Sequence, residues 1–279
     1  MVTTVVVLLL LRQLRLISFP RLDSSIPRKI FPLPILYAVN LISGLGGTQR
    51  ISLPMFTVLR RFSILLTMLL EYTMLGEVPT FGVKLSVFLM IFGSAVAAVF
   101  DLSFDLFGYV LISVNNVATA ANGVYTKKKL DGKELGKSGL LFYNSLFMLI
   151  PLSAIILIHT EDTEKLLSFV ENGHLTVSVW SFLALCCLGG ILLNYSTVLC
   201  TSHNSALTTA CVGPIKNMFV TYIGMFSSGD YVFNLTNFVA INISVLGSVL
   251  YTYVTMRKSQ SKTARHVTVF PAEKAALIA

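Results

Sequence analysis

The chain has 279 residues, of which 54% are hydrophobic and 12% charged, and its formal net charge is +8. Its mean hydropathy is +0.77. Average soluble domains carry about 25% charged residues, so this chain has too little polar surface to cover a water-soluble globule. The composition excludes an ordinary soluble domain and favours a chain folded in a bilayer.

The apolar runs predict an all-α integral membrane protein. A spanning helix needs roughly 20 apolar residues, and eight runs come near that length: 33–48, 54–74, 82–100, 106–125, 139–158, 177–198, 205–226 and 232–255. Residues 2–11 form a further run that is too short to cross alone. Its flanks do not fit a signal peptide, because Arg12 and Arg15 follow it and no basic residue precedes it. We interpret it as the end of a spanning helix that begins outside this chain.

The basic residues indicate the orientation. Fifteen of the 21 lie in three segments, 12–30, 127–137 and the tail after 256, which the predicted spans place on one side. The positive-inside rule puts these segments and the C-terminus in the cytosol. The loop 71–80 is an exception, because it should be cytosolic yet carries Glu71 and Glu77. We interpret the cations as orientation signals, and expect no nucleic-acid partner, since such a surface would place them with aromatic residues on one folded face.

Two segments suggest an internal repeat. LPMFTVLRRFSILLT (53–67) and NSALTTACVGPIKNMFVT (204–221) each carry a cation deep inside an apolar run, and Lys216 follows Arg60 by 156 positions. The helices that follow them are separated by a similar offset. Duplication with inverted topology is common in transporters.

The offset predicts how the chain is divided. The N-terminal repeat would cover 1–102, without its first helix and part of its second. The C-terminal repeat would cover 103–256, and 257–279 would be a cytosolic tail.

Lys216 is the most informative residue. It lies near the middle of its predicted span, roughly 15 Å from either interface, which is farther than a lysine side chain reaches. Such a cation is tolerated where it faces a water-filled cavity and meets an anion, and no predicted span has an acid near its centre. We therefore expect Lys216 to bind an anionic substrate; the alternative is a buried structural partner.

Two further features support an anionic cargo. Arg60 and Arg61 lie roughly 10 Å inside their helix, and the forked arginine side chain suits phosphate. Either could instead bind helix-end carbonyls. Gly213 and Pro214 interrupt the helix that holds Lys216, and broken helices are where transporters build substrate sites.

A third group could recognise a base. Tyr143 can stack on a base and Asn144 can hydrogen-bond to a base edge, although both could equally serve in helix packing. Asn122 lies near a cytosolic helix end, and packing is its alternative role too. Asn115 and Asn116 are weaker candidates. The four cysteines form no CxxC pair, so neither a disulfide scaffold nor a metal site is expected.

Five blocks together resemble the nucleotide-sugar transporters of the drug/metabolite transporter superfamily, most closely the branch for UDP-glucuronic acid, UDP-N-acetylglucosamine and UDP-N-acetylgalactosamine. The blocks are FPLPILY (31–37), LPMFTVLRRF (53–62), TAANGVYTKKKLDGKELGK (119–137), FYNS (142–145) and NSALTTACVGPIKN (204–217). The resemblance implies two inverted five-helix repeats in a ten-helix fold, with both ends cytosolic. It also implies antiport of a nucleotide sugar against the nucleoside monophosphate.

The resemblance assigns roles to several residues. Tyr143 and Asn144 match a motif that contacts the nucleobase, although Ser145 replaces an asparagine there. Gly213, Lys216 and Asn217 match a motif that contacts sugar and phosphate, with Lys216 preceding Asn217 in this chain. The expected activity is therefore transport of UDP-sugars into the Golgi or endoplasmic reticulum lumen in exchange for UMP, with no enzymatic step and no cofactor.

Other readings remain open. The chain could be a non-transporting membrane protein or an inactive truncated isoform, or it could carry other phosphorylated metabolites. The sugar, the choice between Golgi and endoplasmic reticulum, and homo-oligomerisation are left undetermined by the sequence.

Overall fold

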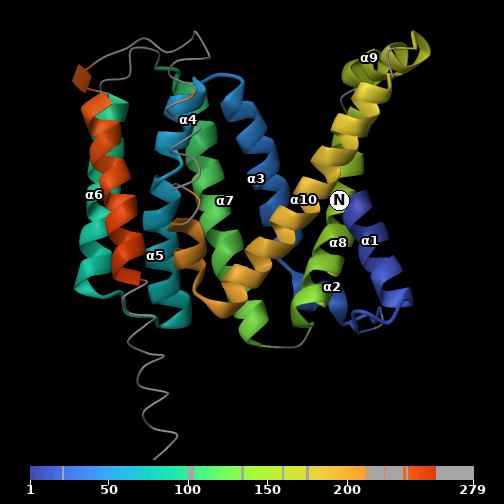
Figure 1. Cartoon of the computed structure of the whole chain (residues 1–279), viewed down its shortest axis with the longest axis horizontal. Coiled ribbons are helices and arrows are strands. Elements are labelled where there is room, and N and C mark those ends of the chain that lie inside the picture. Colours follow the sequence, from blue (N-terminus) through green and yellow to red (C-terminus); the bar gives the residue numbers. More distant parts are fainter. Residues whose placement is uncertain are drawn as a thin grey trace, which may run out of the picture. The chain divides into compact units, whose positions relative to one another are not determined.

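The computed structural model describes residues 1–20, 22–99, 104–132, 135–158, 160–173, 176–211, 213, 223, 235–236 and 238–255. This described part is helical, and its helices are α1 (Val2–Gln13), α2 (Ile26–Ile30), α3 (Leu33–Thr48), α4 (Leu53–Leu59), α5 (Phe62–Leu75), α6 (Phe81–Val99), α7 (Leu106–Asp131), α8 (Gly136–Ile158), α9 (Thr160–Glu171) and α10 (Val177–His203), followed by residues 206–211 and the helix Phe238–Thr255 (Figure 1).

Three described helices are long and apolar enough to cross a membrane: α6, α10 and Phe238–Thr255. The shorter helices α1 and α3 are also apolar. The predicted run 33–48 coincides with α3, and 177–198 lies within α10. The chain is therefore a helical membrane protein, while the number of eight full spans stays a prediction.

The helices form two compact units that do not follow the chain order. Unit 1 contains Met1–Leu45 and Val117–Thr209, and unit 2 contains Gly46–Asn116 and Ala210–Ala279. Each unit therefore draws on both predicted repeats, and α7 contributes to both units. The repeat boundary at residue 102 stays a prediction, since contacts within units do not report on duplication.

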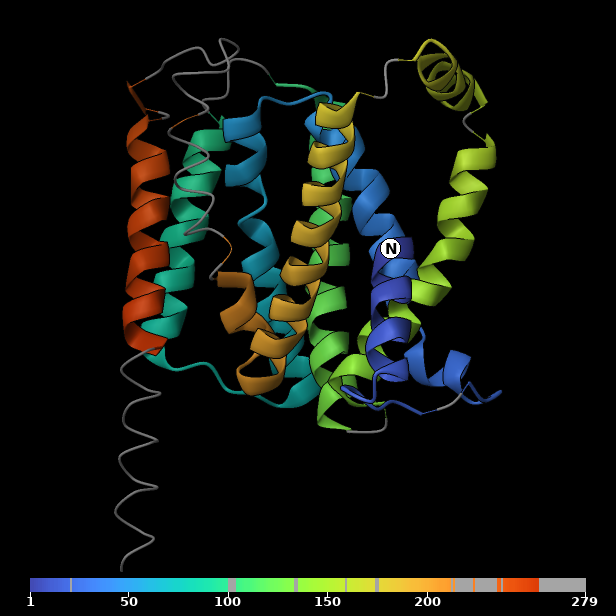
Figure 2. The same ribbon diagram turned by 45° about the vertical axis from the view of Figure 1, so that its right-hand side comes forward.

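Unit 1 is organised around the first half of α8. Val5 and Leu8 of α1, Ile26 and Ile30 of α2, and Phe142 of α8 are buried in one apolar cluster. α1 packs along α8, as both views show (Figure 2). The short apolar run at the N-terminus is thus a helix with a packed face.

Unit 2 contains a close pair of helices, α6 and Phe238–Thr255, which lie side by side in both views (Figures 1 and 2). A Cβ added at Gly93 would lie 2.5 Å from the Ala240 carbonyl oxygen, and one at Gly247 would lie 2.7 Å from the Met90 backbone nitrogen. Glycine is required at both positions because only backbone without a side chain can approach this closely.

Polar bonds join the same two helices. The Ser244 hydroxyl donates to the Met90 carbonyl at 2.7 Å and lies 3.1 Å from the Ser94 hydroxyl. The contacts are reciprocal: Gly93 approaches Ala240 and Ser244, while Gly247 approaches Ser86 and Met90. Residues nearer the start of α6 contact residues nearer the end of Phe238–Thr255, so the two helices run antiparallel.

One acidic residue lies elsewhere than expected. The sequence places Glu71 in a loop, but α5 continues to Leu75, and the Glu71 side chain is only 4% exposed. The helix ends at Gly76, whose left-handed backbone (φ 69°) terminates it without the steric penalty of a Cβ. Glu71 is therefore a buried residue of unit 2, which explains why it does not follow the charge pattern of the loops.

Candidate functional site

The helix that carries the two arginines is broken at them. α4 ends at Leu59, α5 begins at Phe62, and Arg60 and Arg61 form the turn between them. The turn is tightened by hydrogen bonds that span three residues, from the Arg61 amide to the Val58 carbonyl (3.1 Å) and from the Ile64 amide to the Arg61 carbonyl (3.0 Å). Arg60 and Arg61 keep right-handed helical backbone angles, so α4, the turn and α5 together cover the predicted run 54–74.

Side chains satisfy the carbonyl groups near the break. The Ser63 hydroxyl donates to the Arg60 carbonyl at 2.7 Å. The Asn116 amide, from α7, donates to the Leu59 carbonyl at 3.1 Å in a buried position. A buried carbonyl without a partner is costly, so these two bonds allow the helix to break inside the unit.

The two arginines have different surroundings. Arg61 is buried, with 3% of its surface exposed, whereas Arg60 is partly exposed. The Arg60 guanidinium lies 5.7 Å from the centre of the Phe56 ring. Neighbouring helical positions differ by about 100°, which accounts for the divergence. Arg60 is consequently the better placed of the two to meet a solute.

The other predicted phosphate contacts lie mostly outside the described residues. Lys216 and Asn217 lie outside the described residues, and their roles stay predictions. Gly213 is helical and partly buried. Just before it, Cys211 is fully buried. Unit 2 thus includes Arg60, Arg61 and Gly213.

Unit 1 contains Tyr143 and Asn144, which the sequence predicts to recognise the base, and the further substrate-binding candidate Asn122. The side-chain oxygens of Asn122 in α7 and Asn144 in α8 are buried and accept no hydrogen bond from the described part of the chain. A buried polar atom without a partner typically costs about 1–3 kcal/mol, so such atoms need a specific explanation. Each oxygen can therefore accept a hydrogen bond from a donor outside the described part of the chain.

Tyr143 is placed differently from its predicted role. Its side chain is 1% exposed, and its hydroxyl donates a 2.6 Å hydrogen bond to the Pro20 carbonyl. Its ring packs edge-on against Phe19 and Phe142, with centroids 6.1 and 5.1 Å away. This geometry supports a packing role, and stacking on a base stays a prediction without structural support.

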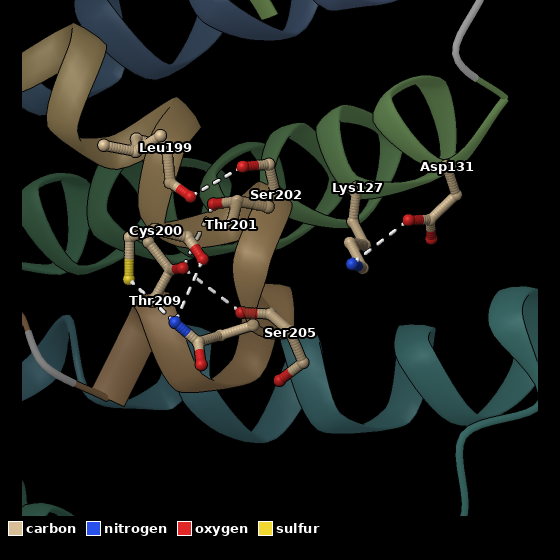
Figure 3. A network of polar contacts seen from close by, with 9 residues as sticks. Lys127, Asp131, Leu199, Cys200, Thr201, Ser202, Ser205 and Thr209 are labelled. Atoms are coloured by element: carbon tan, nitrogen blue, oxygen red, sulfur yellow. Dashed lines mark hydrogen bonds and ion pairs between the residues drawn. The ribbon is translucent and has the colours of Figure 1, made fainter. Parts of the chain in front are cut away.

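A hydroxyl-rich turn follows α10 and leads into residues 206–211 (Figure 3). The Thr201 hydroxyl donates to the Thr209 hydroxyl at 3.1 Å, and the Ser205 hydroxyl accepts from the Thr208 amide at 3.0 Å. Ser205 acts as the helix N-cap, a position that serine favours because its oxygen accepts from a free amide. The turn therefore fixes the start of the segment that leads to Gly213.

Basic side chains lie near the same end of unit 1. Lys137 approaches His203 at 3.0 Å, and Lys127 forms an ion pair with Asp131 at 3.1 Å, which Figure 3 shows beside the hydroxyl-rich turn. The helix α7 extends to Asp131, so Lys127 lies in the helix and not in the predicted loop. The described cysteines are all free, and no group of three His, Cys, Asp or Glu side chains comes together in the described part.

Asn116 is only a weaker candidate from the sequence, although its amide satisfies the Leu59 carbonyl. Its only signal is an amide in an apolar run, which is common in membrane helices and usually reflects packing. The interruption between α4 and α5 had a stronger signal in the sequence, because two adjacent arginines lie deep in an apolar run.

These features define a multi-span helical membrane protein with polar sites inside its helices. They are the apolar helices long enough to cross a membrane, the helix interrupted at Arg60 and Arg61, and the buried amides. The sequence also matches the Triose-phosphate Transporter family over residues 1–252, and the chain belongs to that family.

Several curated proteins are similar over most of their length. The "UDP-sugar transporter sqv-7" of Caenorhabditis elegans is 60% identical over 261 residues, covering 94% of this chain and 79% of that protein. The "UDP-sugar transporter UST74c" of Drosophila melanogaster is 52% identical, covering 92% and 68%. The human "Nucleotide sugar transporter SLC35D2" is 50% identical, covering 92% and 75%. These similarities confirm the predicted membership of the nucleotide-sugar transporters, a group of transporters and not enzymes.

Proposed function

We propose that this protein carries UDP-sugars, such as UDP-glucuronate, UDP-N-acetylglucosamine and UDP-N-acetylgalactosamine, from the cytosol into the Golgi or endoplasmic reticulum lumen in exchange for UMP. The observation that carries the proposal is the 60% identity to a protein named as a UDP-sugar transporter. The partly exposed Arg60 at a helix break supports an anionic cargo. The basic segments and the C-terminus lie on the cytosolic side in this proposal.

Each candidate residue has a proposed role. Arg60 and Lys216 bind the phosphates, because a guanidinium pairs with phosphate through two hydrogen bonds and an ammonium through its charge. Gly213 and Asn217 lie beside the sugar. Asn122 and Asn144 accept hydrogen bonds from the cargo through their buried oxygens. Arg61 and Tyr143 hold the surrounding helices in place.

We also propose that the fold consists of two inverted repeats that rock against each other during transport. The antiparallel pair of α6 and Phe238–Thr255 supports this. Met90 and Ser244, which are hydrogen-bonded, are 154 positions apart, and Gly93 and Gly247 have the same separation. Reciprocal contacts of this kind arise when two equivalent helices meet across a two-fold axis. This separation of 154 positions is close to the 156 positions between Arg60 and Lys216.

A second candidate cargo is a smaller phosphorylated metabolite, which the name of the Triose-phosphate Transporter family favours. Thermal unfolding of the purified protein separates the two. UMP and UDP-N-acetylglucosamine should raise the unfolding temperature, whereas triose phosphate and inorganic phosphate should not. Stabilisation by triose phosphate alone would replace the first proposal with the second, and stabilisation by no anion would favour a non-transporting membrane protein.

A further inference from the structure

The described side chains of α9 (Thr160–Glu171) are exposed, and they form an amphipathic pattern. Among its side chains that the structure describes, Leu167, Phe169 and Val170 are 56%, 42% and 43% exposed. The exposed polar side chains are Glu164, Lys165, Ser168 and Glu171. At 3.6 residues per turn, the described polar and apolar residues, which all lie between 164 and 171, occupy separate arcs of this part of the helix. A water-soluble linker between two spans would not need the apolar arc.

The position of α9 next to a membrane-crossing helix indicates which surroundings its apolar arc contacts. α9 follows α8 and is separated by only a short connection from α10, one of the membrane-crossing helices. No residue in the crossing window of α10 is buried by the described part of the chain. At the start of this helix, Val177, Phe182 and Leu185 are 86%, 67% and 66% exposed, which is the pattern of a lipid-facing surface. In both views α9 is turned away from the axes of α8 and α10 (Figures 1 and 2).

Trp180 indicates the level of the membrane surface near the start of α10. It lies in the first turn of α10, is 56% exposed and is the only tryptophan in the chain. Tryptophan is enriched where the hydrocarbon meets the headgroups. Since Trp180 follows the end of α9 by only nine positions, α9 lies close to the same level.

From these observations we propose that α9 is an interfacial helix, which lies in the plane of the membrane with its apolar arc inserted among the lipids. In the proposed topology this is the luminal leaflet. Helices with one apolar and one polar arc bind membranes in this way. Because Glu164 and Glu171 outnumber Lys165 on the polar arc, the attachment rests on the apolar residues and not on anionic headgroups. The inference is independent of the cargo.

Single-tryptophan fluorescence tests the proposal directly. In a Trp180→Phe background, Val170→Trp places the probe on the apolar arc and Ser168→Trp on the polar arc. The full chain is reconstituted into vesicles of zwitterionic lipid brominated either near the headgroup or near the bilayer centre. The unmodified chain, with Trp180, reports on the interface as a reference.

The proposal predicts a shorter emission wavelength for Val170→Trp than for Ser168→Trp. It also predicts stronger quenching of Val170→Trp by lipid brominated near the headgroup than by lipid brominated at the centre, with no dependence on salt. Equal emission and quenching at the two positions would overturn it. A short wavelength without quenching by either lipid would also overturn it, because protein, such as a second copy, would then cover the arc. Phe169→Trp, which keeps an aromatic side chain, repeats the test if Val170→Trp does not fold.

Discussion

The side-chain amide of Asn116 donates a buried 3.1 Å hydrogen bond to the carbonyl oxygen of Leu59, the last residue of α4. This bond joins α7 to the point at which the arginine-bearing helix breaks. Without it, the Leu59 carbonyl would be left in an apolar interior, because Arg60 and Arg61 interrupt the regular bonding of the helix.

Asn116→Leu should therefore destabilise the protein. Leaving a buried carbonyl unsatisfied costs about 1–3 kcal/mol. The unfolding temperature in detergent should fall, and transport should fall with it because the position of Arg60 depends on the break. Ser113→Ala is the control, since Ser113 lies on the same helix, is exposed and bonds only within it. Equal stability of the two variants would show that the bond does not hold the break.

Alanine substitutions at Arg60 and Arg61 should have different effects on ligand binding and on stability. Arg60→Ala should abolish stabilisation by UMP while leaving the unfolding temperature of the ligand-free protein near that of the unmodified chain, because Arg60 is partly exposed. Arg61→Ala should lower the ligand-free unfolding temperature, because the Arg61 side chain is buried. If Arg61→Ala removed UMP binding at unchanged stability, the assignment of the two residues would be reversed.

Gly93→Leu and Gly247→Leu should both disrupt unit 2. Even a Cβ would lie under 3 Å from backbone atoms of the neighbouring helix at each position, and overpacking of this kind costs about 1–3 kcal/mol or more. Gly189→Ala in α10 is the matched control. A Cβ there meets no atom of the described chain within 4 Å, and alanine favours helix over glycine by about 0.5–1 kcal/mol. Thermal unfolding of the three variants checks the prediction, which fails if the control is as unstable as the others.

Tyr143→Phe distinguishes packing from base recognition. Removing the hydroxyl breaks the 2.6 Å bond to the Pro20 carbonyl and should lower stability by about 0.5–1.5 kcal/mol. If Tyr143 only packs, the preference for UMP over CMP and GMP in competition assays should not change. A change in that preference at unchanged stability would instead restore the role in base recognition.

Much of the fold could be predicted from composition and hydropathy. The predicted runs 33–48, 82–100 and 177–198 coincide with or overlap α3, α6 and α10 because long apolar runs form helices in a bilayer. The ends of helices were harder to predict. α7 includes the lysines that the sequence assigns to a loop, since lysine is a good helix former whose charge reaches water from a helix end.

The grouping of helices could not be predicted from local patterns. Unit 1 combines α1 with α8, and unit 2 combines α6 with Phe238–Thr255, because the packing depends on contacts between distant segments. For the candidate site, residue types pointed to Arg60, Asn122 and Asn144. Their different degrees of burial, and the packed position of Tyr143, follow only from the three-dimensional arrangement.

The central claim is tested most directly by exchange in proteoliposomes. The purified protein is reconstituted into vesicles loaded with UMP, and uptake of labelled UDP-N-acetylglucosamine is compared with uptake into vesicles without UMP. We predict faster uptake into the UMP-loaded vesicles, competition by external UMP but not by triose phosphate, and loss of uptake in Lys216→Ala. Uptake that is absent, or that is equal with and without internal UMP, would contradict nucleotide-sugar exchange by this chain.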